Sequence, residues 1–304
     1  MTSFQIRVPA TSANLGPGFD SIGIALSKYV TMDCQPADEW YFAVPEKDQP
    51  YIPSGEENLV HKTALYTANL YHYESVPPHH VEMTNDVPIA RGLGSSSTAV
   101  VGGIELANHI LDLQLTRFEK LKIACDIEGH PDNVGPAIYG GIMISSYDGN
   151  HLDFVRFSKG LEDLTWLAVV PDFHLETEKA RELLPTEMSY KQAVHASGTA
   201  NVLVAALAEQ NWALAGKMMS RDQWHQPYRK NLISGFDHVQ QTVLGEGALG
   251  MYISGAGPTM VALYDQITPE QLKQLSTSLS DYQIAALTVN TNGAETISSR
   301  LQAN

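Results

Sequence analysis

The sequence has few cysteines, few cations and no long apolar run, and each shortage argues against a class of protein. Its 304 residues include two cysteines, Cys34 and Cys125, too few for a disulfide framework or a cysteine metal cage. We therefore expect both to be reduced thiols. Lysine and arginine number 19 against 34 aspartates and glutamates, and the formal charge of −15 argues against a nucleic-acid-binding surface. A small anionic ligand stays compatible with this charge, because local N–H groups and a few basic side chains can outweigh the overall field.

Targeting and membrane signals are also missing. No run of about 18 apolar residues occurs, so we expect no membrane span. The first twenty residues lack the basic start and unbroken apolar stretch of a signal peptide, which leaves the cytoplasm as the expected compartment. Hydrophobic residues make up 43% and charged residues 17% of the chain, which excludes a disordered protein. The length predicts two domains at roughly 150 residues each.

The first half mixes strands and helices. We expect strands at residues 4–9, 22–30 and 141–146, the last closing this half, and helices at 59–73, 96–111 and from Thr116 to about Glu128. Thr116 and Glu119 have the spacing of a capping box, and Gly129 and Pro131 are expected to end that helix. A turn at 148–150 places the domain boundary near residues 150–160, and we divide the chain into domains 1–155 and 156–304.

The second half reads as a split βαβ unit. We expect strands at 165–170, 249–254, 259–264 and 284–289, the last strand of the chain, and helical segments near 176–184, 190–220 and after Thr268. Thr268, Pro269 and Gln271 provide a capping box with proline at the first helical position.

The strongest functional signal is PIARGLGSSSTAVVGG at residues 88–103. A Gly-Leu-Gly turn lets the backbone approach a ligand closely, and the helix that follows directs free N–H groups at the turn. This arrangement predicts a phosphate site built from backbone, with donors or a magnesium ligand from the adjoining serines. It is not a Walker A loop, because no lysine follows the second glycine. A tight turn followed by a capped helix would explain the same residues.

Two further stretches are rich in glycine and small polar residues. ATSANLGPGFDSIG at residues 10–23 suits a polar small ligand, or an ordinary turn between strands. SGAGPTMVAL at residues 254–263 predicts a hairpin turn that lets two backbones come close. Spacing alone does not tell whether this turn packs against the loop at 88–98.

Together the three stretches resemble the three motifs of the GHMP kinases, in the same order and across most of the chain. Within that family the chain is most similar to the homoserine kinase branch, in the first motif, PATSANLGPGFDSIGIAL at 9–26, and in two further segments, EGHPDNVGPAIYGG at 128–141 and QPYRKNLISGF at 226–236. The resemblance implies an α+β fold of two domains. The ATP-binding N-terminal domain would be S5-like, and the C-terminal domain ferredoxin-like.

The resemblance implies phosphorylation of the side-chain hydroxyl of L-homoserine by ATP, a step toward threonine, by a homodimer that uses Mg²⁺. The loop around ATP would comprise Pro88, Ile89, Ala90, Arg91, Gly92, Leu93, Gly94, Ser95, Ser96, Ser97 and Thr98. The metal would be held by Ser96 and by Glu128, with Asp126 as the alternative acidic ligand. Homoserine would be bound by Asn14, Asp20, Asn133, Thr177, Arg181 and Arg229.

The resemblance assigns a role to each of these side chains. Asp20 would pair with the substrate ammonium and Arg229 with its carboxylate. Asn133 would orient the hydroxyl, and Asp132 is the alternative as a catalytic base. A family member acting on shikimate or mevalonate, or a non-catalytic ATP-binding protein, remains open. Mevalonate has no ammonium, so Asp20 and Arg229 together favour an amino acid.

Overall fold

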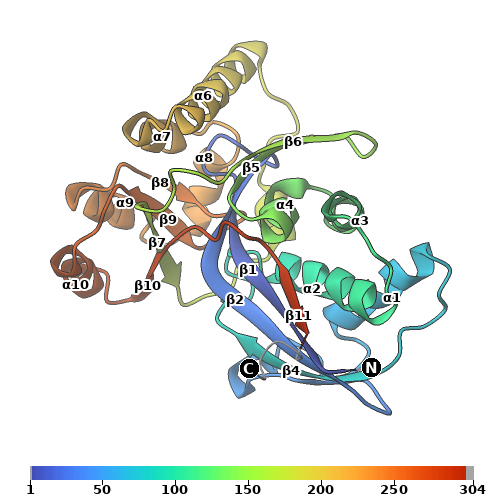
Figure 1. Ribbon diagram of the computed structural model, residues 1–304. Helices are drawn as coiled ribbons and strands as arrows, with labels where there is room; N and C mark the ends of the chain where they lie inside the picture. Colours follow the sequence, from blue (N-terminus) through green and yellow to red (C-terminus); the bar gives the residue numbers. More distant parts are fainter. Residues whose placement is uncertain (1, 299–304) are drawn as a thin grey trace.

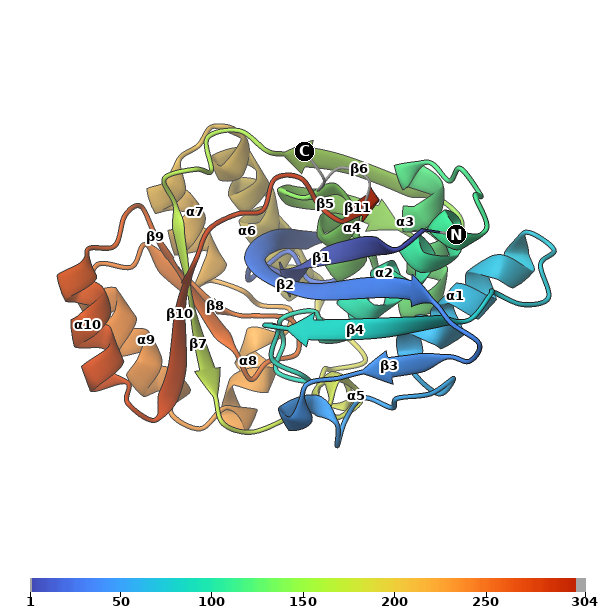
Figure 2. The ribbon, with the colours of Figure 1, turned by 60° about the horizontal axis from the view of Figure 1, so that its bottom comes forward.

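The computed structural model describes residues 2–298, which form two sheets with helices packed against them (Figures 1 and 2). The first sheet contains β1 (Phe4–Ala13), β2 (Ile22–Pro36), β3 (Tyr41–Ala43), β4 (His79–Asn85), β5 (Ile142–Tyr147), β6 (Leu152–Phe157) and β11 (Glu295–Ser298). Its strands follow the order β11-β1-β2-β4-β3, and β5 joins β2 to β6. Only the β3–β4 pair is parallel.

The helices of this half are α1 (Leu59–Leu70), α2 (Ser95–Ile110), α3 (Arg117–Glu128) and α4 (Pro131–Tyr139), with a 3₁₀ turn at Glu46–Asp48. α2 and α4 pack on β1, and α4 also packs on β2. Thr116 and Glu119 form the expected capping box, and Gly129 ends α3 with a φ of 83°. Pro131 was expected only to end the helix; it also occupies the first turn of α4, where its missing N–H costs nothing.

The second half contains β7 (Thr165–Pro171), β8 (Gly250–Ile253), β9 (Met260–Tyr264) and β10 (Tyr282–Leu287), arranged β10-β7-β9-β8. All three pairings are antiparallel, and this order is that of a split βαβ unit, as predicted. Its helices are α5 (Thr177–Glu182), α6 (Tyr190–Ala208), α7 (Trp212–Met219), α8 (Gln226–Arg229), α9 (Phe236–Gly245) and α10 (Pro269–Ser278), with a 3₁₀ turn at Lys230–Leu232.

Alternation along β7 gives the second sheet two buried faces. Leu167 and Val169 belong to a core cluster with residues of α9 and α10, whereas Trp166, Ala168 and Val170 belong to the cluster that extends into the first half. Because successive strand residues point to opposite faces, this one strand contacts both cores. The second sheet is therefore held firmly against the first.

Three expectations were wrong in detail. The segment 190–220 is two helices, α6 and α7, interrupted before Trp212, where Asn211 caps α7. Strand β5 does not close the first half, because β6 follows and pairs with it. The strand near 284–289 is not the last, because β11 returns to pair with β1 (Figure 2). The boundary at residue 155 stays a prediction, and β6 runs across it.

None of the helices within residues 2–298 combines the length and the apolar character needed to cross a membrane. Cys34 and Cys125 are free and buried, and desolvation raises the pKa of each thiol to about 12. Both are therefore inert as nucleophiles near neutral pH.

Candidate active site

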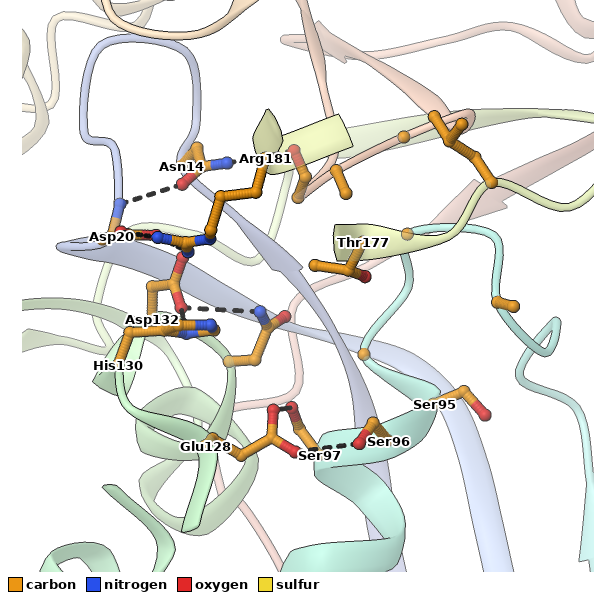
Figure 3. Close-up of a pocket in the computed structure, with 18 of the residues that line it drawn as sticks. Asn14, Asp20, Ser95, Ser96, Ser97, Glu128, His130, Asp132, Thr177 and Arg181 are labelled. Carbon is orange, nitrogen blue, oxygen red and sulfur yellow. Dashed lines mark hydrogen bonds and ion pairs between the residues drawn. The ribbon is translucent and has the colours of Figure 1, made fainter. Parts of the chain in front are cut away.

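The three glycine-rich stretches meet at a pocket of about 360 Å³ between the two halves of the chain (Figure 3). Its walls come from the loop after β1, the loop and first turn of α2, the junction of α3 and α4, the N-terminal part of α5, the end of α8 and the turn between β8 and β9. Such a volume suits a small polar substrate with phosphate groups. No single domain contains the pocket.

Direct contacts lock the third stretch onto the other two. Ser254 donates its Oγ hydrogen bond to the carbonyl of Gly92, and the Thr259 amide donates to the carbonyl of Arg91 over 3.3 Å. Asn14 Nδ2 donates to the Gly255 carbonyl over 3.1 Å. The β8–β9 turn therefore supports both the phosphate-type loop and the loop after β1.

Two glycines of the central loop are required by their surroundings. Gly92 and Gly94 have φ angles of 83° and 71°, a conformation that other residues adopt only with strain. A Cβ at Gly92 would collide with the Ser254 carbonyl, and one at Gly94 with Thr11 Oγ1. Close backbone approach explains the Gly-Leu-Gly sequence and brings the N-terminus of α2 to the pocket.

The first turn of α2 faces an acidic side chain. Ser96 Oγ donates to Glu128 Oε1 over 2.8 Å, and Ser97 Oγ donates to Oε2 over 3.1 Å (Figure 3). The other candidate, Asp126, does not line the pocket and instead accepts a 2.9 Å hydrogen bond from the Tyr147 hydroxyl. Hydroxyl and carboxylate oxygens at the mouth of a phosphate-type loop are suitable ligands for Mg²⁺. Of the two acids, only Glu128 lies beside Ser96.

A buried carboxylate lies at the start of α4. Asp132 is 2% exposed, and its Oδ1 accepts a 2.6 Å hydrogen bond from His130 Nδ1. Burial opposes protonation of His130, but the hydrogen bond and the charges of Asp132, Asp20 and Glu128 outweigh it and raise its pKa to about 9. His130 is therefore an imidazolium at neutral pH and donates to the Asp132 side chain. Asp20 also has a ligand atom within 4.8 Å of both, but its carboxylate is held by an arginine.

Asn133 is oriented by a neighbour from β1. Thr11 Oγ1 donates to Asn133 Oδ1 over 2.8 Å, which identifies Nδ2 as the donor end of the amide. Nδ2 lies 3.5 Å from Asp132 Oδ1, at the limit of a hydrogen bond. The amide of Asn133 is thus available to a polar group that enters the pocket.

Asp20 and Arg181 form an ion pair across the pocket. The two guanidinium nitrogens donate to the two carboxylate oxygens over 2.9 and 3.0 Å, joining the loop after β1 to α5 (Figure 3). The segment bearing Thr177 and Arg181 is helical, as their spacing required, and both side chains line the pocket. The side chains of Asp20 and Arg181 are 33% and 45% exposed, so solvent weakens their ion pair and a charged ligand can compete for either member.

Arg229 is a buried cation that has no carboxylate partner within the described residues. Its side chain donates to the carbonyls of Ala180 and Gly255 over 3.2 and 3.0 Å, and Nη1 lies 3.4 Å from His225 Nδ1. Burial is the main cause that lowers its pKa, to about 10, so the group stays charged. Its second terminal nitrogen, Nη2, donates no hydrogen bond within residues 2–298.

His225 must be neutral to hold Arg229. Its Nε2 donates to the Gly16 carbonyl over 3.1 Å, which leaves Nδ1 as an acceptor facing the guanidinium. Desolvation lowers the pKa of His225 to about 4, despite the nearby charge of Asp222. Asp222 accepts hydrogen bonds from the amides of Trp224, His225 and Gln226, and so fixes the start of α8.

Most of the residues predicted from the sequence line this pocket; besides the alternative metal ligand Asp126, four do not. It is lined by Asn14, Asp20, Ala90, Arg91, Gly92, Gly94, Ser95, Ser96, Ser97, Glu128, Asp132, Asn133, Thr177, Arg181 and Arg229. Pro88 and Ile89 line a second hollow of about 400 Å³, which Arg91 also borders. Leu93 is fully buried in the core, and Thr98 is buried with its hydroxyl bonded to the Ser95 carbonyl.

The sequence analysis did not assign functional roles to three residues at this site. His130 pairs with Asp132, Phe19 lines the pocket, and His225 supports Arg229. His130 lies in the segment that resembles homoserine kinases and Phe19 in the first motif, so motif position was the available signal. For His225 no local pattern existed, because its partner Gly16 is 209 residues away.

Comparisons with known proteins agree with this geometry. The chain matches the GHMP kinases N terminal domain over residues 58–141 and the GHMP kinases C terminal domain over residues 203–276. It is 44% identical over 292 residues to a homoserine kinase of Bacillus velezensis, covering 96% of this chain and 94% of the relative.

Solved structures give the same result for the fold. A structure assigned to a homoserine kinase of Listeria monocytogenes superimposes with a TM-score of 0.82 and 39% identity, covering 97% of this chain and 99% of that one. A homoserine kinase from Cytophaga hutchinsonii gives a TM-score of 0.82 at 29% identity, covering 98% of each chain. The two-domain α+β fold implied by the resemblance is confirmed.

Proposed function

The chain belongs to the GHMP kinase family, and from this premise we propose that it transfers the γ-phosphoryl group of ATP to the side-chain hydroxyl of L-homoserine. The products are O-phospho-L-homoserine and ADP, a step toward threonine. The choice of an amino acid as the acceptor rests on the environment of Arg229. A buried guanidinium that has no carboxylate partner among residues 2–298, at a pocket in a chain of net charge −15, suits a substrate carboxylate.

Both charges of a zwitterionic amino acid find partners in the pocket. The ammonium replaces Arg181 at the carboxylate of Asp20, and the carboxylate of the substrate takes Arg229 and the released Arg181. In the absence of substrate, Asp20 and Arg181 pair with each other, so their charges are balanced then as well. Thr177 and Asn14 border the same space, although both ends of the Asn14 amide already bind protein, at Asp20 N and Gly255 O.

The phosphate groups of ATP lie along residues 90–97. Free N–H groups at the N-terminus of α2 and its partial positive charge stabilise the anion. Arg91 borders both hollows and is paired with the exposed Asp172, which a phosphate can displace. We place the nucleoside in the second hollow, beside Pro88 and Ile89.

Ser96 and Glu128 fit a magnesium ion that accompanies the nucleotide. Their oxygens lie 2.8 Å apart at the end of the phosphate-type loop, and Mg²⁺ prefers such hard oxygen ligands. When bound, the ion neutralises charge on the phosphates during transfer. Glu128, held by two serine hydroxyls, keeps its carboxylate directed at that loop.

Asn133 orients the hydroxyl of the acceptor. Its amide oxygen is held by Thr11, its Nδ2 lies beside Asp132 Oδ1, and the residue lines the pocket. Asp132 is the alternative as a base, but one of its oxygens is occupied by the proton of His130. Phosphoryl transfer depends on positioning and charge neutralisation more than on proton abstraction. We therefore retain Asn133 as the orienting group.

A panel of alcohols tests the proposal. Purified protein is incubated with ATP, Mg²⁺ and L-homoserine, shikimate, mevalonate or 3-aminopropanol, and ADP release is coupled to an optical signal. We expect L-homoserine to give the highest kcat/KM by at least about 10²-fold, since the alternatives lack one of its two charges. A chain that releases no ADP with L-homoserine, or prefers mevalonate, would contradict the assignment.

The homodimer implied by the family resemblance remains a proposal as well. Light scattering during size-exclusion chromatography checks it, and a mass near the monomer value of 33.3 kDa would contradict it.

A further inference from the structure

Phe19 contacts three functional side chains at once. It lies in the loop after β1, next to Asp20, is half-buried, and lines the pocket. The Cζ atoms of Arg229 and Arg181 lie 5.3 and 5.5 Å from the centre of its ring. The ring of His225 stacks on it with centroids 5.4 Å apart and planes inclined by 26°.

The two guanidiniums carry like charges and repel each other. The charge of Arg181 is, after burial, the next cause that lowers the pKa of Arg229, so the groups interact unfavourably. An aromatic face carries partial negative charge and attracts a cation within about 6 Å of its centroid. Phe19 therefore attracts both guanidiniums without supplying a carboxylate that would occupy their hydrogen-bond donors.

This distinction matters for a carboxylate receptor. An acidic residue at the position of Phe19 would bind the same donors that a substrate carboxylate needs. The ring leaves Nη2 of Arg229 free, because this nitrogen donates no hydrogen bond within the described part of the chain, whereas the donors of Arg181 are held by Asp20. Phe19 also lines a second hollow together with Ile22, Phe154, Val155 and Trp224.

We propose that Phe19 is a positioning residue for substrate selectivity: its ring holds Arg181 and Arg229 together as the receptor for the carboxylate of the amino-acid acceptor. The inference rests on the proposed function and adds the group that sets the spacing of the two cations. It assigns no chemical step to Phe19. Its effect should appear in the binding of a carboxylate-bearing acceptor and not in the transfer itself.

Phe19→Leu tests this role, because leucine keeps apolar bulk and lacks the aromatic face. We expect the KM for L-homoserine to rise about tenfold, equivalent to ~1.4 kcal/mol, with kcat within about threefold of the wild type. The KM for ATP should stay within about twofold, since the phosphate-type loop does not depend on the ring. With 3-aminopropanol, which has no carboxylate, kcat/KM should stay within about threefold.

Three further variants control for a merely structural effect. Phe19→Tyr retains the ring and should keep the KM for L-homoserine within about threefold of the wild type. Phe19→Met, which is flexible enough to fill the same space, should behave as Phe19→Leu does and replaces it if the leucine variant fails to fold. Phe154→Leu removes a half-buried ring that packs on Tyr139, and it should leave kcat/KM unchanged for both acceptors.

The outcomes separate the two proposals. If the wild type is active and the KM for L-homoserine is unchanged in Phe19→Leu and Phe19→Met, the role of Phe19 is overturned and the proposed function stands. Equal losses on L-homoserine and 3-aminopropanol overturn it as well, since the ring would then act on the whole pocket. A folded wild type that does not phosphorylate L-homoserine overturns both.

Discussion

Arg229→Leu should remove the recognition of the acceptor carboxylate with little effect on ATP. Arg229 is 2% exposed, its Nε and Nη1 bind two carbonyls, and Nη1 also faces His225 Nδ1. Within the described residues, the two hydrogens of Nη2 are therefore the donors that remain. Two charge-assisted hydrogen bonds are worth about 1.5–3 kcal/mol each, and part of that gain is offset by desolvation. A net loss of ~2.7 kcal/mol corresponds to about 10²-fold in kcat/KM for L-homoserine.

The assay compares two acceptors with each protein. ADP release is measured with L-homoserine and with 3-aminopropanol, which lacks the carboxylate, for wild type and variant. Leucine also removes the guanidinium donor from the carbonyls of Ala180 and Gly255, of which Gly255 keeps the donor Asn14 Nδ2, so the variant should be less stable. That effect acts on both acceptors equally and cancels in the comparison, which is a double-mutant cycle with the substrate group as one partner.

Arg156→Leu is a matched control. Arg156 is half-buried, lies outside the pocket and donates to the carbonyls of Gly140 and Thr291, as Arg229 does to its own two carbonyls. Its loss should leave kcat/KM for both acceptors within about threefold at a temperature where the protein stays folded. If Arg229→Leu lowers kcat/KM equally for L-homoserine and 3-aminopropanol, Arg229 does not bind the carboxylate and the argument for an amino-acid acceptor fails.

Three other predictions concern the metal, the base and acid stability. Glu128→Gln should lower kcat by at least about 10²-fold at saturating Mg²⁺, whereas the kcat of Asp126→Asn should stay within about threefold of the wild type. The reverse ranking of the two variants in steady-state assays would assign the metal to Asp126. Asp132→Asn should keep measurable turnover with a nearly flat pH–rate profile; a loss of about 10²–10⁴-fold in a folded protein would identify Asp132 as a general base. Burial lowers the pKa of His225 from 6.5 to about 4, so between these values the unfolded chain binds a proton that the folded chain does not. The free energy of unfolding from urea titrations should therefore fall from pH 6.5 toward pH 4 by up to ~3 kcal/mol, less steeply in His225→Gln, and equal slopes in the two proteins would exclude this contribution.

Local sequence was sufficient for elements whose signals lie within a few residues. The capping boxes at Thr116 and Thr268 have the predicted partners, because a cap involves residues three positions apart. The four strands of the second half and their split βαβ order were also predicted, since alternation and turns are read along the chain. Strand β11 was missed, because four half-exposed residues become a strand only by pairing with β1.

By itself, the sequence determined the two-domain fold, the family and a phosphate-type loop, because glycine positions and helix starts are local properties of the backbone. Only the tertiary structure decided which charges are paired. Arg229 resembles a surface arginine in the sequence and is buried, Arg181 pairs with an aspartate 161 residues away, and Glu128 rather than Asp126 meets Ser96. The physical reason is that the energy of a charge depends on its burial and on its partners, and both are set by segments far apart in the chain.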